Sequence, residues 1–327
     1  MIEKEVFTDK DLDELSFSDI YFTPEKVAYI QNKESRWGLK AIETPDLKEF
    51  YKTLQSGFTK NSSYSICYKK SLYRVERVKT VTGVHYSARR MPEKTPDLKG
   101  LGYPEYLIKY LLSLNNTSGL ILIGGPTGMG KTTTASSLLK SYLEMEGGFA
   151  YTIEDPPEMP LDGIYRAKNK GLGLCKQTEP IESDWGGSLR SALRSRPRYI
   201  LVGEIRTPET AAQVLRAAIS GHLVISTVHA NSIEDSINSI VKYAIASGLN
   251  EELAFDLLSR GILGVLFQRL QGIKVLHPEV FFAFANPNTM QADQMRLIIR
   301  DGQLNLGTLI EAQQEKMLQG KPLFKTY

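Results

Sequence analysis

The sequence predicts an α/β protein in two parts, a smaller N-terminal α+β domain and a larger domain of alternating strands and helices. Three observations predict this division. Short segments with strand-like alternation fill residues 1–90, a segment rich in proline and glycine follows, and apolar runs then alternate with helical stretches. Strand–helix alternation of this kind is typical of a doubly wound sheet that is largely parallel.

The N-terminal domain is predicted from segments in which apolar and polar residues alternate. We expect strands at 27–30, 64–68, 73–78 and 84–88, separated by turns such as Thr82-Gly83. A helical stretch at 44–54 lies between the first two of these strands. Residues 1–90 are therefore expected to form a small α+β domain.

Residues 91–104 are predicted to be a linker or hinge. Proline lacks a backbone N–H and disfavours helix in the residue before it, so clustered prolines interrupt regular structure. Glycine adds conformational freedom. The interrupting residues are Pro92, Pro96, Gly100, Gly102 and Pro104.

The larger domain is predicted to span residues 105–327. A helical pattern begins at Glu105, and short apolar runs typical of buried parallel strands occupy 120–123, 149–153, 199–202 and 223–225. Helices are expected at 132–143 and from Pro208, with Thr207 as the N-cap and Gly221 as the stop signal. From about Glu251 we expect a tail that is mostly helical.

Composition excludes several functional classes. The 40 basic and 37 acidic residues give a formal charge of +3, which by itself argues neither for nor against a nucleic-acid partner; we expect none. The two cysteines form no C-x-x-C pair and the four histidines form no H-E-x-x-H motif, which argues against a zinc site or a disulfide framework. The N-terminus lacks an apolar signal-peptide core, and no apolar run is long enough to span a bilayer. We expect a reduced, cytoplasmic protein that reaches any membrane through a partner.

The strongest motif is a phosphate-binding loop that satisfies G-x-x-x-x-G-K-[ST]. It follows a predicted strand and precedes a predicted helix, as the motif requires. Glycines let the loop turn its amide N–H groups toward phosphate oxygens, and the helix N-terminus adds a positive dipole. The alternative is a glycine-rich turn with a surface lysine. The candidate residues are Gly125, Pro126, Thr127, Gly128, Met129, Gly130, Lys131, Thr132 and Thr133.

Two of these residues have specific expected roles. Lys131 is predicted to reach the β- and γ-phosphates of a bound nucleotide, and the hydroxyl of Thr132 is predicted to be a ligand of Mg²⁺. The sequence thus predicts ATP or a related nucleotide, with Mg²⁺, as the ligand.

Glu204 is the candidate general base for hydrolysis, because it follows the buried run 199–202 at the end where ligands bind in α/β sheets. Gly203 stands where many P-loop proteins carry a metal-binding aspartate, so Glu204 is predicted to activate water rather than to hold the metal. The alternative is a solvated carboxylate at the end of a strand.

Two further acids and a histidine also follow predicted strands. Glu154 and Asp155 come after the run 149–153, where they either support the metal and water or form an ordinary turn, since Asp155 precedes a proline. His229 ends the run after Gly221 and is either a γ-phosphate sensor or a structural histidine.

Together these motifs resemble one family, the type II/type IV secretion ATPases, including its PilT-like branch. The resemblance lies in the phosphate loop at 124–134, an acidic segment at 151–156, the Gly203-Glu204 strand at 192–206 and a histidine segment at 221–229. Their order and spacing match, and Gln268-Arg269-Leu270 falls where the family has a similar segment. The resemblance covers 105 to about 280 strongly and the N-terminal domain more weakly, through Asp19, Arg74 and Arg89.

The resemblance implies a RecA-like P-loop domain, a PAS-like N-terminal domain and hydrolysis of ATP. It assigns Glu204 as general base, Glu154 and Asp155 as residues that assist metal and water, and His229 as the monitor of nucleotide state. Lys131 is the lysine of the phosphate loop.

The resemblance also implies a homo-hexamer that binds ATP between the N-terminal domain of one subunit and the RecA-like domain of another. Arg74 and Arg89 would then be charge-stabilising arginines, with Arg90 as a substitute; the alternative is a solvated strand face. The implied partner is an inner-membrane platform protein of a pilus, conjugation or secretion apparatus, with which the protein associates from the cytoplasm.

The sequence departs from the family in places and leaves other functions open. Arg196 and Arg198 flank Pro197, where acidic residues are common, and the tetracysteine motif of the assembly-type branch is absent, which favours the PilT-like branch. The direction of the motor stays open. The alternatives are a regulatory subunit that binds nucleotide with little turnover, and a DNA-translocating RecA-like ATPase.

Overall fold

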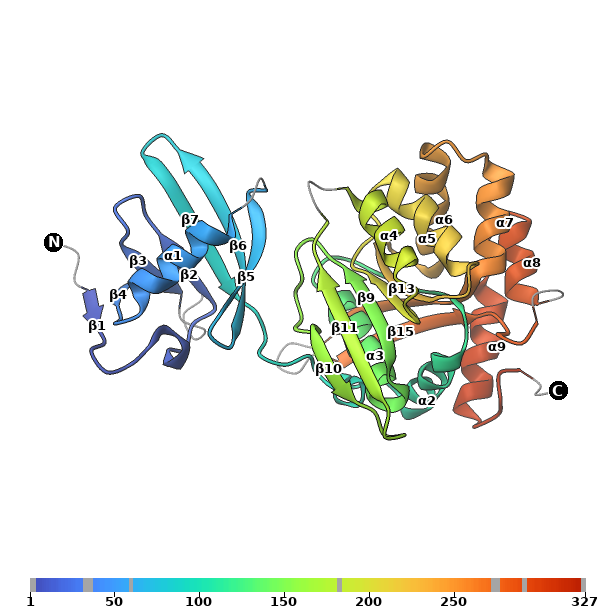
Figure 1. The fold of residues 1–327 in the computed structure, drawn as a ribbon. Coiled ribbons are helices and arrows are strands. Elements are labelled where there is room, and N and C mark those ends of the chain that lie inside the picture. The colour runs from blue at the N-terminus through green and yellow to red at the C-terminus, as the bar shows by residue number, and fades with distance from the viewer. Residues whose placement is uncertain are drawn as a thin grey trace. The chain divides into compact units, whose positions relative to one another are not determined.

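The computed structural model describes residues 4–31, 38–58, 61–180, 184–271, 277–289 and 293–324 (Figure 1). Residues 1–94 and 155–160 form a first unit, and residues 95–154 and 161–327 form a second. Each unit has its own sheet and its own hydrophobic core. The predicted α/β class, with a P-loop domain and a smaller α+β domain, is confirmed.

The first unit is a sheet with strand order β1-β4-β3-β2-β7-β6-β5. Every neighbouring pair is antiparallel except β1 and β4. The strands predicted from alternation are present as β3, β5, β6 and β7. The bounds are β1 (Lys4–Val6), β2 (Asp19–Phe22), β3 (Ala28–Gln31), β4 (Leu39–Glu43), β5 (Ser63–Tyr68), β6 (Ser71–Thr80) and β7 (Gly83–Arg90).

Helix α1 (Leu47–Gly57) covers one face of this sheet (Figure 1). Its buried residues Phe50 and Leu54 are four positions apart, the spacing that places side chains on one helix face. The ring of Phe50 packs edge-on against Tyr68 and Tyr73, with centroids 5.0 and 4.8 Å away. These aromatic contacts fix the helix on the sheet.

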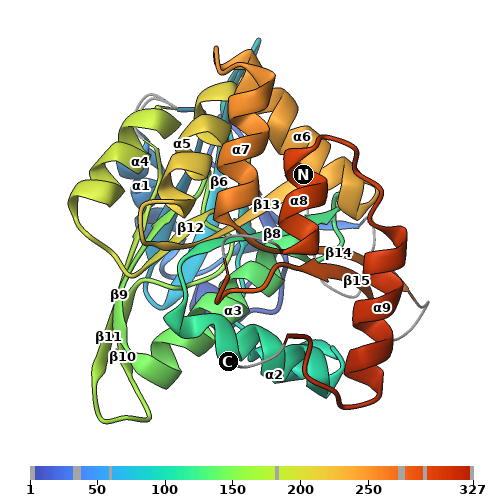
Figure 2. The same cartoon turned by 90° about the vertical axis from the view of Figure 1, so that its right-hand side faces the viewer.

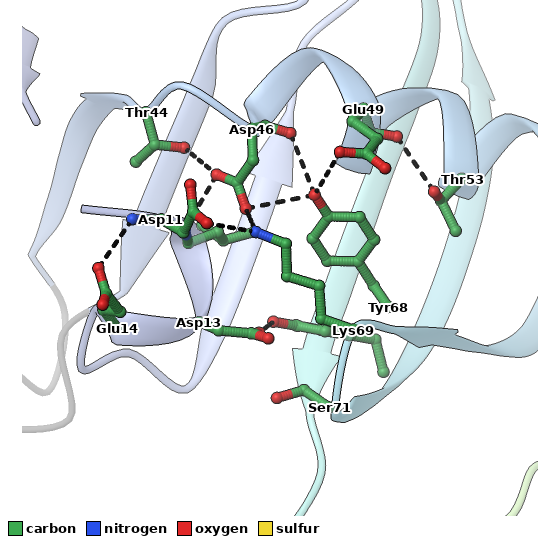
Figure 3. Close-up of polar contacts among 12 residues, drawn as sticks. Asp11, Asp13, Glu14, Thr44, Asp46, Glu49, Thr53, Tyr68, Lys69 and Ser71 are labelled. Carbon is green, nitrogen blue, oxygen red and sulfur yellow. Dashed lines mark hydrogen bonds and ion pairs between the residues drawn. The ribbon is translucent and has the colours of Figure 1, made fainter. Parts of the chain in front are cut away.

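A polar network beside α1 joins three segments of the first unit (Figure 3). Lys69, in the turn between β5 and β6, has its Nζ 2.7 Å from a carboxylate oxygen of both Asp11 and Asp46. The other oxygen of Asp46 accepts hydrogen bonds from the Thr44 hydroxyl at 2.8 Å and the Leu12 amide at 3.0 Å. The network therefore ties η1 (Leu12–Glu14), the start of α1 and the β5–β6 turn together.

The second unit is built on a sheet with strand order β10-β11-β9-β12-β13-β8-β14-β15. The six inner strands are parallel, and β10 and β15 pair antiparallel at the two edges. The bounds are β8 (Gly119–Gly125), β9 (Gly148–Ile153), β10 (Gly163–Arg166), β11 (Leu172–Thr178), β12 (Tyr199–Val202), β13 (Leu223–His229), β14 (Ile262–Gln271) and β15 (His277–Phe284).

Helices pack on both faces of this sheet, as expected for a doubly wound fold (Figure 2). Alternate residues of strand β8 pack on opposite faces of the sheet: Leu120 and Leu122 belong to one core, and Ile121 and Ile123 belong to the other. One face carries α4 (Trp185–Arg194), α5 (Pro208–Ala218), α6 (Ile233–Ala246), α7 (Glu251–Gly261) and α8 (Gln294–Arg300). The other carries α2 (Glu105–Ser113) and α3 (Lys131–Glu146).

The remaining elements complete the second unit. Helix α9 (Gly307–Leu318) lies beside β15, where the Gln313 side chain exchanges hydrogen bonds with the backbone of Phe284. Short turns of 3-10 helix, η2 (Leu98–Leu101) and η3 (Leu114–Asn116), flank α2. No helix within the described ranges is both long enough and apolar enough to cross a membrane.

The expectation of a mostly helical tail is wrong in one important part. After α7 the chain forms β14, which pairs in parallel with β8, and then β15. Every residue from Ile262 to Phe267 is buried, so the run shows neither a two-residue nor a 3.6-residue period. A continuous apolar run is compatible with a buried strand or a buried helix, and only its pairing with β8 decides between them.

Candidate functional site

The phosphate-binding loop joins the carboxyl end of β8 to the start of α3. Gly128 and Gly130 have φ angles of +77° and +76°, which favour glycine. A Cβ on Gly125 would lie 2.5 Å from the backbone oxygen of Gln268, so a side chain there would displace the loop. The motif glycines thus satisfy both the conformation and the packing of the loop.

Lys131, the first residue of α3, folds back under the loop and is only 7% exposed. Its Nζ donates hydrogen bonds to the backbone oxygens of Gly125 at 2.8 Å and Pro126 at 2.9 Å. The ammonium group is therefore held inside the loop, at the positive end of the α3 dipole.

Glu204 and His229 lie together beside the loop. Glu204 follows β12, His229 ends the neighbouring strand β13, and His229 pairs in register with Gly125. The Nε2 of His229 is 3.3 Å from Oε1 of Glu204 and 3.1 Å from Oγ1 of Thr127. A protonated Nε2 can donate to one of these oxygens, and an unprotonated Nε2 can accept from the Thr127 hydroxyl. The imidazole thus connects the carboxylate to the loop.

Arg206 makes the second contact of Glu204. Its Nε and Nη2 lie 2.6 and 2.5 Å from Oε2 of Glu204. The side chain of Glu204 is 14% exposed and that of Arg206 is 61% exposed. The carboxylate is therefore mostly buried, whereas the guanidinium group is largely in solvent. Both oxygens of the carboxylate are engaged in this state.

Glu154 lies at the end of β9 and is 2% exposed. Its Oε1 accepts a hydrogen bond from Nε2 of Gln177 at 2.8 Å. A Cβ on Gly203 would lie 3.2 Å from Cγ of Glu154, so the glycine before Glu204 allows Glu154 to approach closely. Asp155 begins the 155–160 segment, which belongs to the first unit.

The arginines lie on the sheet of the first unit. Arg74 of β6 pairs in register with Arg89 of β7, and Arg89 pairs with Asp19 of β2. The side chains of Arg74 and Arg89 are 43% and 66% exposed, and Nε of Arg89 lies 2.9 Å from Oδ1 of Asp19. Nη1 of Arg74 lies 3.5 Å from Oε1 of Glu158, so each of the two facing guanidinium groups has a carboxylate partner of its own.

Arg90, the predicted substitute, has a different setting. Its side chain is 11% exposed and donates hydrogen bonds to Asp13, Ser71 and the backbone oxygen of Leu15. These contacts hold the guanidinium inside the first unit. Arg90 is therefore a packing residue in this structure rather than a free cation.

The structure also bears on the metal prediction. No cluster of three or more histidine, cysteine, aspartate or glutamate side chains that suits a metal ion occurs in the described part of the chain. Thr132 lies in the first turn of α3 and is partly exposed. A hydroxyl oxygen such as that of Thr132 is the kind of ligand that Mg²⁺ takes together with phosphate oxygens and water.

A cavity of about 710 Å³ lies elsewhere, within the first unit between β1, β4 and α1. Its lining includes Phe22, Ile42 and Tyr51, and none of the predicted site residues contributes to it. It is therefore separate from the phosphate loop.

Two residues that support the loop have no motif that predicts this role. Gln268 of β14 donates from Nε2 to the backbone oxygen of Met129 at 2.6 Å, and Tyr103 donates from its hydroxyl to Oε1 of Gln268 at 2.8 Å. The sequence offered two signals for Gln268: it directly follows a buried apolar run, and Gln268-Arg269-Leu270 resembles a segment of the family, without an assigned role.

The parallel sheet, the glycine-rich loop at its carboxyl edge and the acidic residues on neighbouring strands define a protein of the P-loop α/β class. The sequence matches the family described as "Type II/IV secretion system protein" over residues 63–297, and the chain belongs to this family. The match includes β5 to β7 of the first unit as well as the phosphate loop.

Curated relatives come from secretion and pilus systems. The type II secretion system protein E of Xanthomonas campestris pv. campestris is 32% identical over 238 residues, which are 71% of this chain and 38% of that protein. A twitching motility protein of Neisseria gonorrhoeae is 32% identical over 198 residues, 61% of this chain and 50% of that protein. The chain thus spans half or less of these two relatives.

Solved structures show the same fold. The pilus retraction motor PilT with bound ADP has a TM-score of 0.67 and 29% identity, covering 95% of this chain and 88% of that one. The ATPase DotB of Legionella pneumophila has a TM-score of 0.68 and 21% identity, covering 94% and 85%.

Proposed function

We propose that this protein is a motor ATPase that couples ATP hydrolysis to the movement of a type IV pilus or to secretion or conjugative transfer. The observation that carries the proposal is the contact of Glu204 with His229, and of His229 with Thr127 of the phosphate loop. This contact supports the proposal because a carboxylate and an imidazole lie beside the loop that would hold the terminal phosphate. Membership of the secretion family and the ADP in the PilT structure support it.

In this proposal the loop residues 125–133 bind the phosphates through their amide groups. Lys131 exchanges its bonds to the Gly125 and Pro126 oxygens for the β- and γ-phosphates. Thr132 and water would hold Mg²⁺, which supplies positive charge against the developing charge of the transition state.

Glu204 acts as the general base for the attacking water, with Glu154 and Asp155 assisting metal and water. Its Oε2 is paired with Arg206 and its Oε1 with His229, and Oε1 keeps a second lone pair that can accept a hydrogen bond from the attacking water. Arg206 is the more exposed partner and can rotate into solvent at little cost. His229 then reports the state of the phosphate through its contact with Thr127.

The motor is proposed to be a homo-hexamer in the cytoplasm, attached to the inner membrane through a platform protein. Arg74 and Arg89 would reach the nucleotide of a neighbouring subunit and stabilise charge as phosphate leaves. ATP binding would close a hinge in the linker 91–104 between domains 1–90 and 105–327, and hydrolysis would reopen it.

Phosphate release at steady state tests this function. Lys131→Ala is expected to lose ATP binding and turnover, and Glu204→Gln to lose about 10²- to 10⁴-fold in kcat while it still binds ATP. Glu209→Gln is the matched control, because Glu209 is an exposed carboxylate at the start of α5.

The outcomes separate the candidate functions. Unchanged turnover in Glu204→Gln would refute its role as base. Tight ATP binding with wild-type turnover at the buffer level would favour a regulatory subunit instead of a motor.

A further inference from the structure

A buried amide supports the phosphate loop from behind. Gln268 is 1% exposed and lies on β14, which pairs with β8 as far as Phe267 and Gly124, where the loop begins. Its Nε2 donates to the backbone oxygen of Met129 at 2.6 Å. The next contact along the strand also reaches the loop, because the amide of Leu270 lies 3.3 Å from the sulfur of Met129. The position of Met129 is therefore set by β14.

The opposite side of this amide is held by Tyr103. The hydroxyl of Tyr103 donates its one proton to Oε1 of Gln268 at 2.8 Å and accepts a hydrogen bond from the Thr134 hydroxyl at 2.6 Å. Burial raises the pKa of Tyr103 to about 12, so its hydroxyl remains protonated at neutral pH. One connected chain of hydrogen bonds thus runs from Thr134 on α3 through Tyr103 and Gln268 to the backbone oxygen of Met129.

Tyr103 belongs to the segment 95–104, which contacts helix α3 at a second place as well. Lys140 of α3 donates from Nζ to the backbone oxygen of Thr95 at 3.0 Å and to Oδ1 of Asp97 at 2.6 Å. Leu98, between these attachments, is 1% exposed. Residues 95–104 are therefore packed on the helix that begins at the phosphate loop, and in sequence they directly follow Lys94 of the first unit.

We propose that Gln268 and Tyr103 are positioning residues that couple the state of the phosphate loop to the segment 95–104. A phosphate that shifts the Met129 carbonyl changes the hydrogen bond of the Gln268 amide, and Tyr103 has to follow, because a buried polar group without a partner is costly. The first residues of the second unit would thereby respond to the nucleotide. This inference rests on the proposed ATP binding.

Kinetics test the positioning role. Gln268→Met and Tyr103→Phe should each raise the KM for ATP about five- to tenfold, as expected for the loss of a buried hydrogen bond, and should change kcat less than twofold. The double variant should be no worse than Gln268→Met alone, because both substitutions break one chain.

Tyr142→Phe is the matched control. Tyr142 lies on α3 and is fully buried, and its hydroxyl donates to the backbone oxygen of Leu111 at 2.7 Å, away from the loop. Its KM should equal the wild-type value. A Tyr103→Phe variant that behaves like Tyr142→Phe would overturn the positioning role.

Hydrogen exchange tests the coupling itself. Saturating MgADP should slow exchange at 125–133 and at 95–104 in the wild type. In Tyr103→Phe at saturation, protection should persist at 125–133 and disappear at 95–104. Equal protection of both segments in the variant, or no nucleotide effect on 95–104 in the wild type, would overturn the coupling. If the wild type binds no nucleotide, the proposed function fails instead.

Discussion

At the scale of single residues, the site depends on two glycines of the phosphate loop, Gly125 and Gly128. Gly125 is packed against the backbone oxygen of Gln268, whereas nothing lies within 4 Å of a Cβ placed on Gly128. The two glycines therefore serve different purposes. Gly125 allows a close approach of two backbone segments, and Gly128 allows a left-handed conformation.

Alanine substitutions are expected to separate these purposes. Gly128→Ala should weaken ATP binding about 5- to 30-fold. A left-handed conformation costs a non-glycine residue roughly 1–2 kcal/mol, and the alanine avoids this cost only when the loop leaves the conformation that binds phosphate. Gly125→Ala should bind no measurable ATP, because its Cβ would lie 2.5 Å from a backbone oxygen. Equilibrium titration with a fluorescent ATP analogue measures both. Equal affinities for the two variants would contradict this explanation.

At the scale of elements, the network around Asp46 joins helix α1 to the rest of the first unit (Figure 3). Burial raises the pKa of Asp46, but hydrogen bonds from Lys69, Thr44 and the Leu12 amide outweigh it, so the pKa lies below its ordinary value of 3.8. A carboxylate with a lowered pKa stabilises the folded state above its unfolded pKa. This stabilisation is lost as the pH falls through the folded-state pKa.

Asp46→Asn should therefore destabilise the first unit at pH 7 by about 1–3 kcal/mol, the cost of disrupting a buried, hydrogen-bonded carboxylate. The difference from wild type should shrink as the pH falls below 3.8. Hydrogen exchange of the α1 amides at several pH values measures it. Asp9→Asn, at an exposed carboxylate of the same unit, should have no effect. A stability difference between wild type and Asp46→Asn that grows toward low pH would contradict this expected pH dependence.

Elements differed in how well the sequence predicted them. The strand before the loop, the loop itself and the N-cap of α5 at Thr207 were predicted, because each carries a local signal of turn, cap or motif. Strand β14 was not, because its apolar run begins directly after helix α7, with no turn between them to end the helical pattern. The contact of Tyr103 with Gln268 spans 165 positions, and no local pattern predicts such a pair.

The candidate site was predicted in the same uneven way. Glu154, Glu204 and His229 were identified because the carboxyl ends of parallel strands share one edge of a sheet. The pairing of Arg206 with Glu204 was not, because it depends on side-chain conformation beyond the end of β12. The roles of all these residues remain predictions.

At the scale of the whole molecule, the proposed hexamer would build each active site from residues of two neighbouring subunits. Arg74 and Arg89 lie side by side on the first unit, and Glu204 belongs to the second unit. If the arginines act on a neighbour's nucleotide, one active site needs the carboxylate of one subunit and the arginines of the next.

Mixing two inactive variants tests this arrangement. Arg74→Ala/Arg89→Ala and Glu204→Gln are each expected to lose at least about 10²-fold in turnover. Mixed rings contain interfaces with an intact Glu204 on one side and intact arginines on the other, so part of the phosphate release should return. Mixtures that remain as inactive as the separate variants would contradict action between subunits.

The central claim is that the loop at 125–133 binds ATP and that Glu204 promotes its hydrolysis. A single-turnover experiment, with enzyme in excess over labelled ATP and with Mg²⁺ present, tests it most directly because it separates binding from chemistry. The wild type should bind the label and convert it to ADP, whereas Glu204→Gln should retain it as ATP. Conversion by Glu204→Gln at the wild-type rate, or no binding by either protein, would contradict the claim.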